Sequence, residues 1–92
     1  MHDAPLPHLI LYGRPGCHLC DESRDLVMAV LDERRRSGLP VPTVVERDIT
    51  THPDWERAFF TTIPVLELGD RHLDLALSVA KIKRLLADVL DG

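Results

Sequence analysis

The spacing of apolar residues divides the first half of the chain into a strand, a helix and a second strand. An unbroken apolar run at residues 9–12 is typical of a central strand covered on both faces. After the turn formers at residues 13–16, apolar residues recur at helical spacing from residue 17 to about residue 36. β-branched residues dominate residues 41–49 and predict the second strand, parallel to the first. The helical spacing is set by Leu19, Leu26, Val27, Val30 and Leu31.

A short second helix is expected after the second strand. Thr51 to Asp54 resembles a helix start, and Trp55 and Phe59 are four residues apart, which gives the helix one apolar face. We expect core packing for at least two of the aromatic residues Trp55, Phe59 and Phe60, with docking of a partner as the alternative.

The remaining pattern predicts a hairpin and a final helix. Residues 65–68 and 71–73 flank Gly69 and Asp70, a signal for a two-residue hairpin turn. Ser78 is placed to cap the final helix, whose apolar residues form one continuous stripe. The predicted order is β-α-β-α-β-β-α, an α/β fold with a four-stranded mixed sheet flanked by helices. This is the order of elements in the thioredoxin fold.

The length of 92 residues suits one compact domain with one hydrophobic core. We expect a single domain over residues 1–92, with an ordered core at about residues 8–90. Residues 1–7 contain spaced prolines and are expected to form an irregular lead-in.

Composition and charge narrow the class of protein. Apolar residues make up 45% and charged residues 28%, as in ordinary globular proteins. The net charge of -4 gives no broad positive field, so a nucleic-acid partner is not expected. The basic run Arg34, Arg35 and Arg36 is interpreted as charge that complements the end of the helix dipole.

Targeting signals are not expected in this chain. The N-terminal segment lacks the charged and apolar regions of a signal peptide, and no run reaches the roughly 20 apolar residues of a membrane-spanning helix. We therefore expect a cytoplasmic protein with no membrane partner, and a monomer.

The cysteine pair Cys17 and Cys20 carries the chemistry. A disulfide over so short a loop constrains little of the unfolded chain, so in a reducing compartment the pair is interpreted as reactive. Disulfide exchange needs an exposed thiolate and a second thiol that resolves the mixed disulfide. Cys17 lies at the start of the predicted helix, where free N–H groups favour an anion, and Cys20 follows one turn later and is expected to be more buried.

Charged neighbours modify this expectation only slightly. Asp21 and Glu22 disfavour a thiolate, whereas Arg14 and His18 favour it, and each contact is worth about 1 kcal/mol at water-like screening. We expect the helix terminus to dominate, so that Cys17 titrates below the free-thiol pKa of roughly 8.5. For His18, exposure to solvent is favoured over a contact with the thiolate.

A metal site and an inert buried pair are the alternatives for the two cysteines. A structural zinc site needs two more ligands, and the remaining histidines show no second paired spacing. Those histidines are His2, His8, His52 and His72. No metal is therefore expected.

Residues 12–20, Tyr-Gly-Arg-Pro-Gly-Cys-His-Leu-Cys, resemble the active-site segment of glutaredoxins, and closely that of the small bacterial glutaredoxin-like family. The resemblance extends from about His8 to Leu90. Thr62-Ile63-Pro64 resembles the Thr-Val-Pro segment of that family, which implies a cis-proline at Pro64 beside the cysteines. In the family, the backbone before this proline pairs with the substrate or with glutathione, and the resemblance carries that role to Ile63. Arg14 matches a basic position near the glutathione carboxylate of the family.

Residues 74–78, Asp-Leu-Ala-Leu-Ser, depart from the family pattern, which has Gly-Gly and a polar-acidic pair that binds glutathione. The leucine blocks the approach of a tripeptide, and Ser78 alone replaces the expected carboxylate. The departure argues against high-affinity glutathione binding, although glutathione stays one candidate for the reductant.

We therefore expect a thiol–disulfide oxidoreductase in which Cys17 attacks, Cys20 resolves and an external thiol restores the dithiol. The substrates are protein or small-molecule disulfides, the substrate-binding residues are Arg14, His18, Ile63 and Pro64, and no tightly bound cofactor is expected. The alternatives are a non-enzymatic iron–sulfur carrier, which the missing Gly-Gly disfavours, and a binding module with a redox switch.

Overall fold

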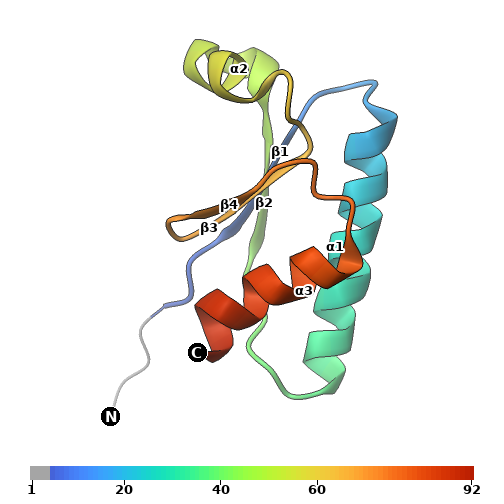
Figure 1. Cartoon of the computed structure of the whole chain (residues 1–92), viewed down its shortest axis with the longest axis vertical. Helices are drawn as coiled ribbons and strands as arrows, with labels where there is room; N and C mark the ends of the chain where they lie inside the picture. Colours follow the sequence, from blue (N-terminus) through green and yellow to red (C-terminus); the bar gives the residue numbers. More distant parts are fainter. Residues whose placement is uncertain (1–4) are drawn as a thin grey trace.

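The computed structural model describes residues 5–92, and the predicted order of elements is confirmed (Figure 1). The predicted lead-in lies partly outside the described residues, since it includes residues 1–4. The elements are β1 (Leu9–Gly13), α1 (His18–Arg36), β2 (Val44–Asp48), a 3-10 turn (Ile49–Thr51), α2 (Pro53–Phe59), β3 (Val65–Leu68), β4 (Arg71–Leu73), α3 (Val79–Leu86) and a terminal π turn (Ala87–Asp91).

The sheet is four-stranded, with the order β2-β1-β3-β4. β1 pairs in parallel with β2 and antiparallel with β3, and β3 pairs antiparallel with β4. The sheet is therefore mixed, as predicted. β1 is a central strand of the sheet, which explains its unbroken run of apolar residues. Leu9 and Leu11 are buried on one face of the sheet and Tyr12 on the other.

Two hydrophobic clusters occupy the two faces of the sheet. The larger lies under α1 and α3, which Figure 1 shows on the same side of the sheet, and includes Leu9, Leu66 and Ile82. The smaller lies near α2, at the end of the molecule where β1 and β2 end, and contains Cys20 and Ile63. The cysteine pair thus sits where the smaller cluster meets the start of α1.

Two details of the sequence interpretation change, and one is confirmed. β2 begins at Val44 rather than residue 41, because Pro40 and Pro42 offer no N–H to a ladder. Leu19 does not belong to the buried stripe of α1: its side chain is 47% exposed in the first turn. The expectation for the aromatic residues is confirmed, since Trp55 and Phe59 pack on the smaller cluster and Phe60 is exposed.

Arg34 lies in the last turn of α1, where the sequence predicts positive charge that complements the helix dipole. It is only 6% exposed, and its burial was not predicted. It lies one turn beyond Val30 and Leu31 on the buried face of α1, and its guanidinium donates to both carboxylate oxygens of Asp91 and to the Pro40 carbonyl. Arg34 therefore joins the end of α1 to the last turn of the chain.

Candidate functional site

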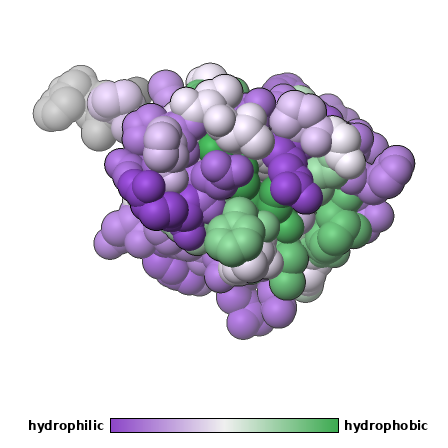
Figure 2. All heavy atoms as spheres, turned by 90° about the horizontal axis from the view of Figure 1, so that it is seen from above, coloured by the Kyte–Doolittle hydropathy of each residue, from purple (hydrophilic) through white to green (hydrophobic). Residues whose placement is uncertain are grey.

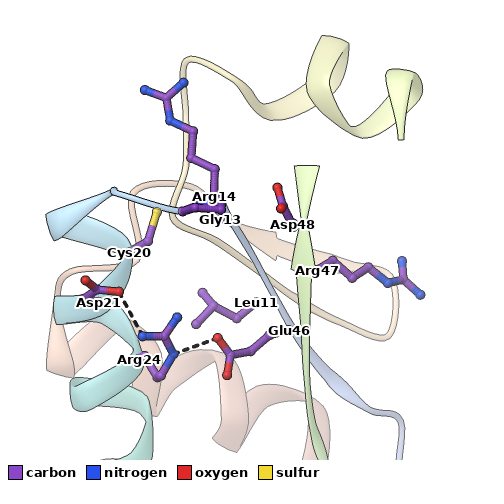
Figure 3. A pocket seen from close by; sticks show the side chains of 10 residues that line it. Leu11, Gly13, Arg14, Cys20, Asp21, Arg24, Glu46, Arg47 and Asp48 are labelled. Carbon is purple, nitrogen blue, oxygen red and sulfur yellow. Dashed lines mark hydrogen bonds and ion pairs between the residues drawn. The ribbon is translucent and has the colours of Figure 1, made fainter. Parts of the chain in front are cut away.

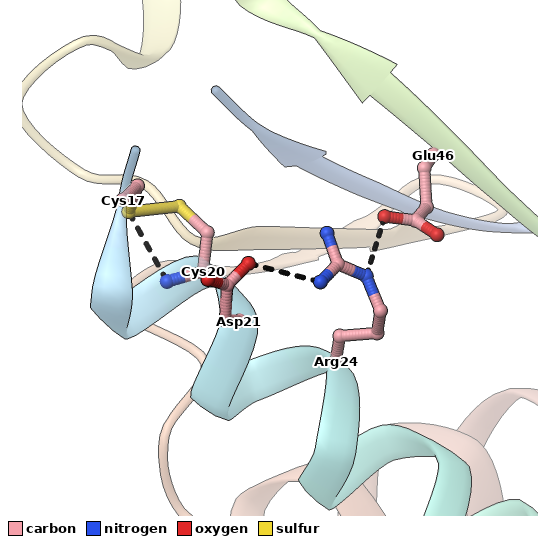
Figure 4. The surroundings of a disulfide bond; sticks show 5 residues. All are labelled: Cys17, Cys20, Asp21, Arg24 and Glu46. Atoms are coloured by element: carbon pink, nitrogen blue, oxygen red, sulfur yellow. Dashed lines mark hydrogen bonds and ion pairs between the residues drawn. A yellow bond between two sulfur atoms is a disulfide. The ribbon is translucent and has the colours of Figure 1, made fainter. Parts of the chain in front are cut away.

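Cys17 and Cys20 form a disulfide at the start of α1, with their Cα atoms 5.2 Å apart (Figure 4). Cys17 is the N-cap of the helix and has extended backbone angles, φ -97° and ψ 105°. Its side chain is partly buried, whereas Cys20, in the first turn, is only 2% exposed. The sulfur of Cys17 is therefore the more accessible of the two.

The first turn of α1 directs backbone donors at Cys17. The N–H of Cys20 donates to Sγ of Cys17 at 3.1 Å, and the N–H of Asp21 donates to the Cys17 carbonyl at 3.1 Å. The first helical N–H groups lack intrahelical acceptors, so a sulfur at the N-cap satisfies one of them. The same N–H stabilises negative charge on Sγ when the disulfide opens.

A cavity of about 280 Å³ lies on the other side of Cys20, between the carboxyl ends of β1 and β2 and the start of α1 (Figure 3). Arg24 crosses it: its guanidinium donates to Glu46 of β2 at 2.7 Å and to Asp21 at 2.9 Å. These hydrogen bonds, the one to Glu46 foremost, raise the pKa of Arg24 and keep it charged. The ion pairs tie α1 to β2 beside Cys20. Sequence reasoning missed this bridge, because Arg24 and Glu46 are far apart along the chain.

The segment before β3 carries the cis peptide bond implied by the family resemblance, between Ile63 and Pro64. Ile63 packs in the same cluster as Cys17 and Cys20, so the fold brings this segment beside the cysteines. The N–H of Ile63 donates to the Phe59 carbonyl at 3.0 Å. This N–H is therefore already paired within the fold.

The loop of residues 74–78 is hydrogen-bonded to the cis-proline segment. The N–H of Leu75 donates to the Thr62 carbonyl at 3.0 Å, and the N–H of Ala76 donates to the Pro64 carbonyl at 2.8 Å. Leu75 has φ 48° and an exposed side chain. The hydroxyl of Ser78 accepts from the N–H of Lys81 at 3.2 Å, which makes it the predicted cap of α3. That hydroxyl is thus used within the helix.

The two basic candidates lie at the surface. Arg14 is exposed and lines the cavity beside Cys20. His18 is exposed in the first turn of α1, in line with the interpretation that it faces solvent.

An aromatic and charged cluster beneath α2 was also missed from the sequence. The hydroxyl of Tyr12 donates to Glu67 at 3.1 Å and accepts from Arg47 at 3.0 Å, while Phe59 packs on the Tyr12 ring at 4.3 Å between centroids. Burial first, and the bond to Glu67 second, raises the pKa of Tyr12. Arg47 also covers the Trp55 ring, with its central carbon 4.9 Å from the ring centroid. These contacts hold α2 against the sheet, in the same hydrophobic cluster as the two cysteines.

Residues 5–92 contain neither a candidate membrane-spanning helix nor a candidate cluster of metal ligands. None of the helices there is long and apolar enough to cross a membrane. Nor does this part of the chain bring together three or more histidine, cysteine or acidic residues as metal ligands.

Comparisons with known proteins identify a family and a related structure. A family model described as a glutaredoxin-like domain (DUF836) matches residues 8–88. The X-ray structure of the Northeast Structural Genomics target protein XcR50 from X. campestris is 25% identical to this chain. The match covers 87% of this chain and 96% of that one, with a TM-score of 0.69. No curated protein matches the chain.

Proposed function

Because the chain belongs to the glutaredoxin-like domain (DUF836) family, we propose that it is a thiol–disulfide oxidoreductase with Cys17 as nucleophile and Cys20 as resolving thiol. The family membership expected from the sequence is confirmed by the match over residues 8–88. The proposal concerns the reaction, which family membership alone does not establish.

The observation that carries the proposal is the asymmetry of the linked sulfurs. Cys17 is the more accessible and accepts a hydrogen bond from a helical N–H, whereas Cys20 is nearly inaccessible. A nucleophile needs access and support for its thiolate, and a resolving thiol needs only proximity to the first sulfur. The two sites therefore suit two different steps.

The reaction transfers two electrons from the dithiol to a substrate disulfide. The Cys17 thiolate attacks one substrate sulfur, the substrate disulfide breaks, and the released thiolate takes up a proton. The Cys20 thiol loses its proton and attacks Cys17 in the mixed disulfide, which releases the second substrate thiol and forms the Cys17–Cys20 disulfide seen here. Two equivalents of an external thiol, with glutathione as one candidate, then restore the dithiol.

Four further residues are proposed to contact the substrate. The Ile63 carbonyl accepts a backbone N–H of the substrate, and Pro64 holds that carbonyl beside Cys17. Arg14 and His18 are exposed on either side of Cys17 in sequence and offer positive charge to a substrate carboxylate. A thiol-driven cycle of this kind suits the reducing cytoplasm.

Reduction of insulin disulfides, with dithiothreitol as the terminal reductant, tests the proposal. Cys17→Ser should lose the catalysed rate, and Cys20→Ser should accumulate a mixed disulfide that mass spectrometry detects. The thermal unfolding of both variants should match that of the reduced wild type. Full activity of Cys17→Ser would overturn the assignment.

A further inference from the structure

Two exposed apolar side chains adjoin the cis-proline segment, Phe60 along the chain and Leu75 through a hydrogen bond. Phe60 directly follows α2, two residues before Thr62, and is 58% exposed. Leu75 is 52% exposed and is joined to the same segment through its N–H bond to the Thr62 carbonyl. Figure 2 looks onto this end of the molecule and shows apolar surface gathered among polar side chains.

Leu75 is held in a conformation that leucine disfavours. Its φ of 48° lies in the left-handed region, where a side chain crowds the backbone and glycine is preferred. The hydrogen bonds of Leu75 and Ala76 to the cis-proline segment fix this conformation. Yet about half of the side chain stays in solvent, so packing in the core does not account for a leucine here. A disfavoured backbone with an exposed side chain, held against the cis-proline segment, points to a contact with a ligand.

We propose that Leu75 and Phe60 select disulfides of polypeptides whose cysteine is flanked by apolar side chains, over the disulfide of glutathione. The inference rests on the proposed function, because the occupant must bring a sulfur to Cys17. Ile63 packs in one cluster with Cys17, so a chain whose cysteine reaches that sulfur passes over residues 62–64. Its neighbouring side chains then meet Leu75 and Phe60, which both adjoin this segment.

The chemistry of glutathione fits this surface poorly. Glutathione is a small anionic tripeptide with two carboxylates and no apolar side chain, so it gains nothing from Leu75 or Phe60. The residue next to Leu75, Asp74, is an exposed acid that disfavours a carboxylate. A polypeptide gains apolar burial at both positions and a backbone hydrogen bond to the Ile63 carbonyl.

The test compares rates with which the reduced protein reacts with three disulfides in excess. These are a peptide disulfide with leucine on both sides of each cysteine, the same peptide with serine in place of leucine, and glutathione disulfide. The wild type should react about tenfold faster with the leucine peptide than with the serine peptide, and slowest with glutathione disulfide. Leu75→Asn and Phe60→Ser should each reduce the preference for leucine to about threefold or less. Their rates with the serine peptide should stay unchanged.

Asparagine and glycine both tolerate the left-handed conformation, so Leu75→Asn and Leu75→Gly remove the apolar side chain and keep the loop. Leu75→Gly should also raise the rate with glutathione disulfide. Leu39→Asn is the matched control: Leu39 is 43% exposed in the loop at the opposite end of α1, and its loss should leave the preference unchanged.

The possible outcomes separate the two proposals. Equal rates with both peptides in the wild type, or an unchanged preference in both Leu75 variants, would overturn the specificity and leave the oxidoreductase intact. A wild type that reacts faster with glutathione disulfide than with the leucine peptide would also overturn the specificity and leave the oxidoreductase proposal intact. Failure of the wild type to reduce any of the three disulfides would overturn both.

Discussion

A Cβ atom on Gly13 would lie 3.1 Å from both Cβ and Sγ of Cys20. The last residue of β1 therefore packs so closely on Cys20 that a side chain at position 13 fits only if one of the two residues moves. Sequence reasoning treated this glycine as part of a turn. The structure instead makes it the surface against which Cys20 is buried.

Gly13→Ala should consequently destabilise the oxidised protein by about 1–2 kcal/mol, as expected for overpacking a tight contact. It should also shift the redox equilibrium with dithiothreitol, because the Cys20 sulfur is displaced. Gly38→Ala is the control. Gly38 has φ 74°, and a Cβ atom added there would meet no atom within 4 Å. The expected loss of about 1 kcal/mol in stability therefore comes from the backbone conformation alone. The control should leave the redox equilibrium unchanged. Urea unfolding and redox titration measure both effects, and unaltered behaviour of Gly13→Ala would contradict the packing argument.

The elements could be predicted from the sequence because their signals are local. The apolar run of β1 and the glycine-aspartate turn between β3 and β4 each lie within a few residues. The cysteine pair was found for the same reason: its spacing and the helix that follows it are contiguous. Cys17 is the more accessible because it caps the helix, and Cys20 is buried because it lies in the first helical turn.

Contacts that depend on strand register or tertiary packing could not be predicted in this way. The bridge from Arg24 to Glu46 and the bond from Tyr12 to Glu67 join residues 22 and 55 positions apart. The left-handed conformation of Leu75 has no sequence signal, because the residue is not glycine. It arises from hydrogen bonds to the cis-proline segment, which only the folded chain brings alongside.

Glu46→Gln should make ionisation of Cys20 easier in the reduced protein. Asp21, Arg24 and Glu46 together carry a net charge of -1 beside Cys20, and the substitution brings this charge to zero. The Cys20 thiol should titrate lower by less than one pH unit, since the groups are partly exposed and screened.

NMR titration of selectively labelled cysteine would measure the change in Cys20. Glu33→Gln is the control, because it neutralises an acid of α1 that pairs with Lys83, away from the cysteines. If Glu46→Gln and Glu33→Gln change the titration of the Cys20 thiol equally, the effect comes from the net charge of the protein. The charges beside Cys20 would then not be its cause.

Ser23→Ala should stabilise the protein by about 0.5–1 kcal/mol. Ser23 is fully buried on α1, and its hydroxyl has no hydrogen-bond partner within residues 5–92. Removing an unpaired buried hydroxyl recovers its desolvation cost, and alanine has the higher helix propensity. The midpoint of thermal unfolding should rise by roughly 2–8 °C for a domain of this size. Ser37→Ala, at the exposed end of α1, should have a smaller effect, and a loss of stability in Ser23→Ala would indicate a hidden partner for the hydroxyl.

The contact between Arg34 and Asp91 should make part of the folding stability depend on acid pH. The hydrogen bond from Arg34 lowers the pKa of Asp91 below its ordinary value of 3.8. A carboxylate with a lowered folded pKa stabilises the fold fully above the unfolded pKa, and loses that contribution as the pH falls through the folded value. Asp91→Asn should therefore be less stable than the wild type at pH 6, and the difference should shrink as the pH falls below 4.

Urea unfolding at several pH values would measure this difference. Asp32→Asn is the control, because Asp32 pairs with the exposed Arg35 and Arg36 and contributes little to stability. Arg34→Lys should lose much of the same stability although the charge is kept, since lysine cannot donate to two carboxylate oxygens and the Pro40 carbonyl at once. A difference between wild type and Asp91→Asn that is as large at pH 2.5 as at pH 6 would show that the ion pair does not act through the Asp91 charge.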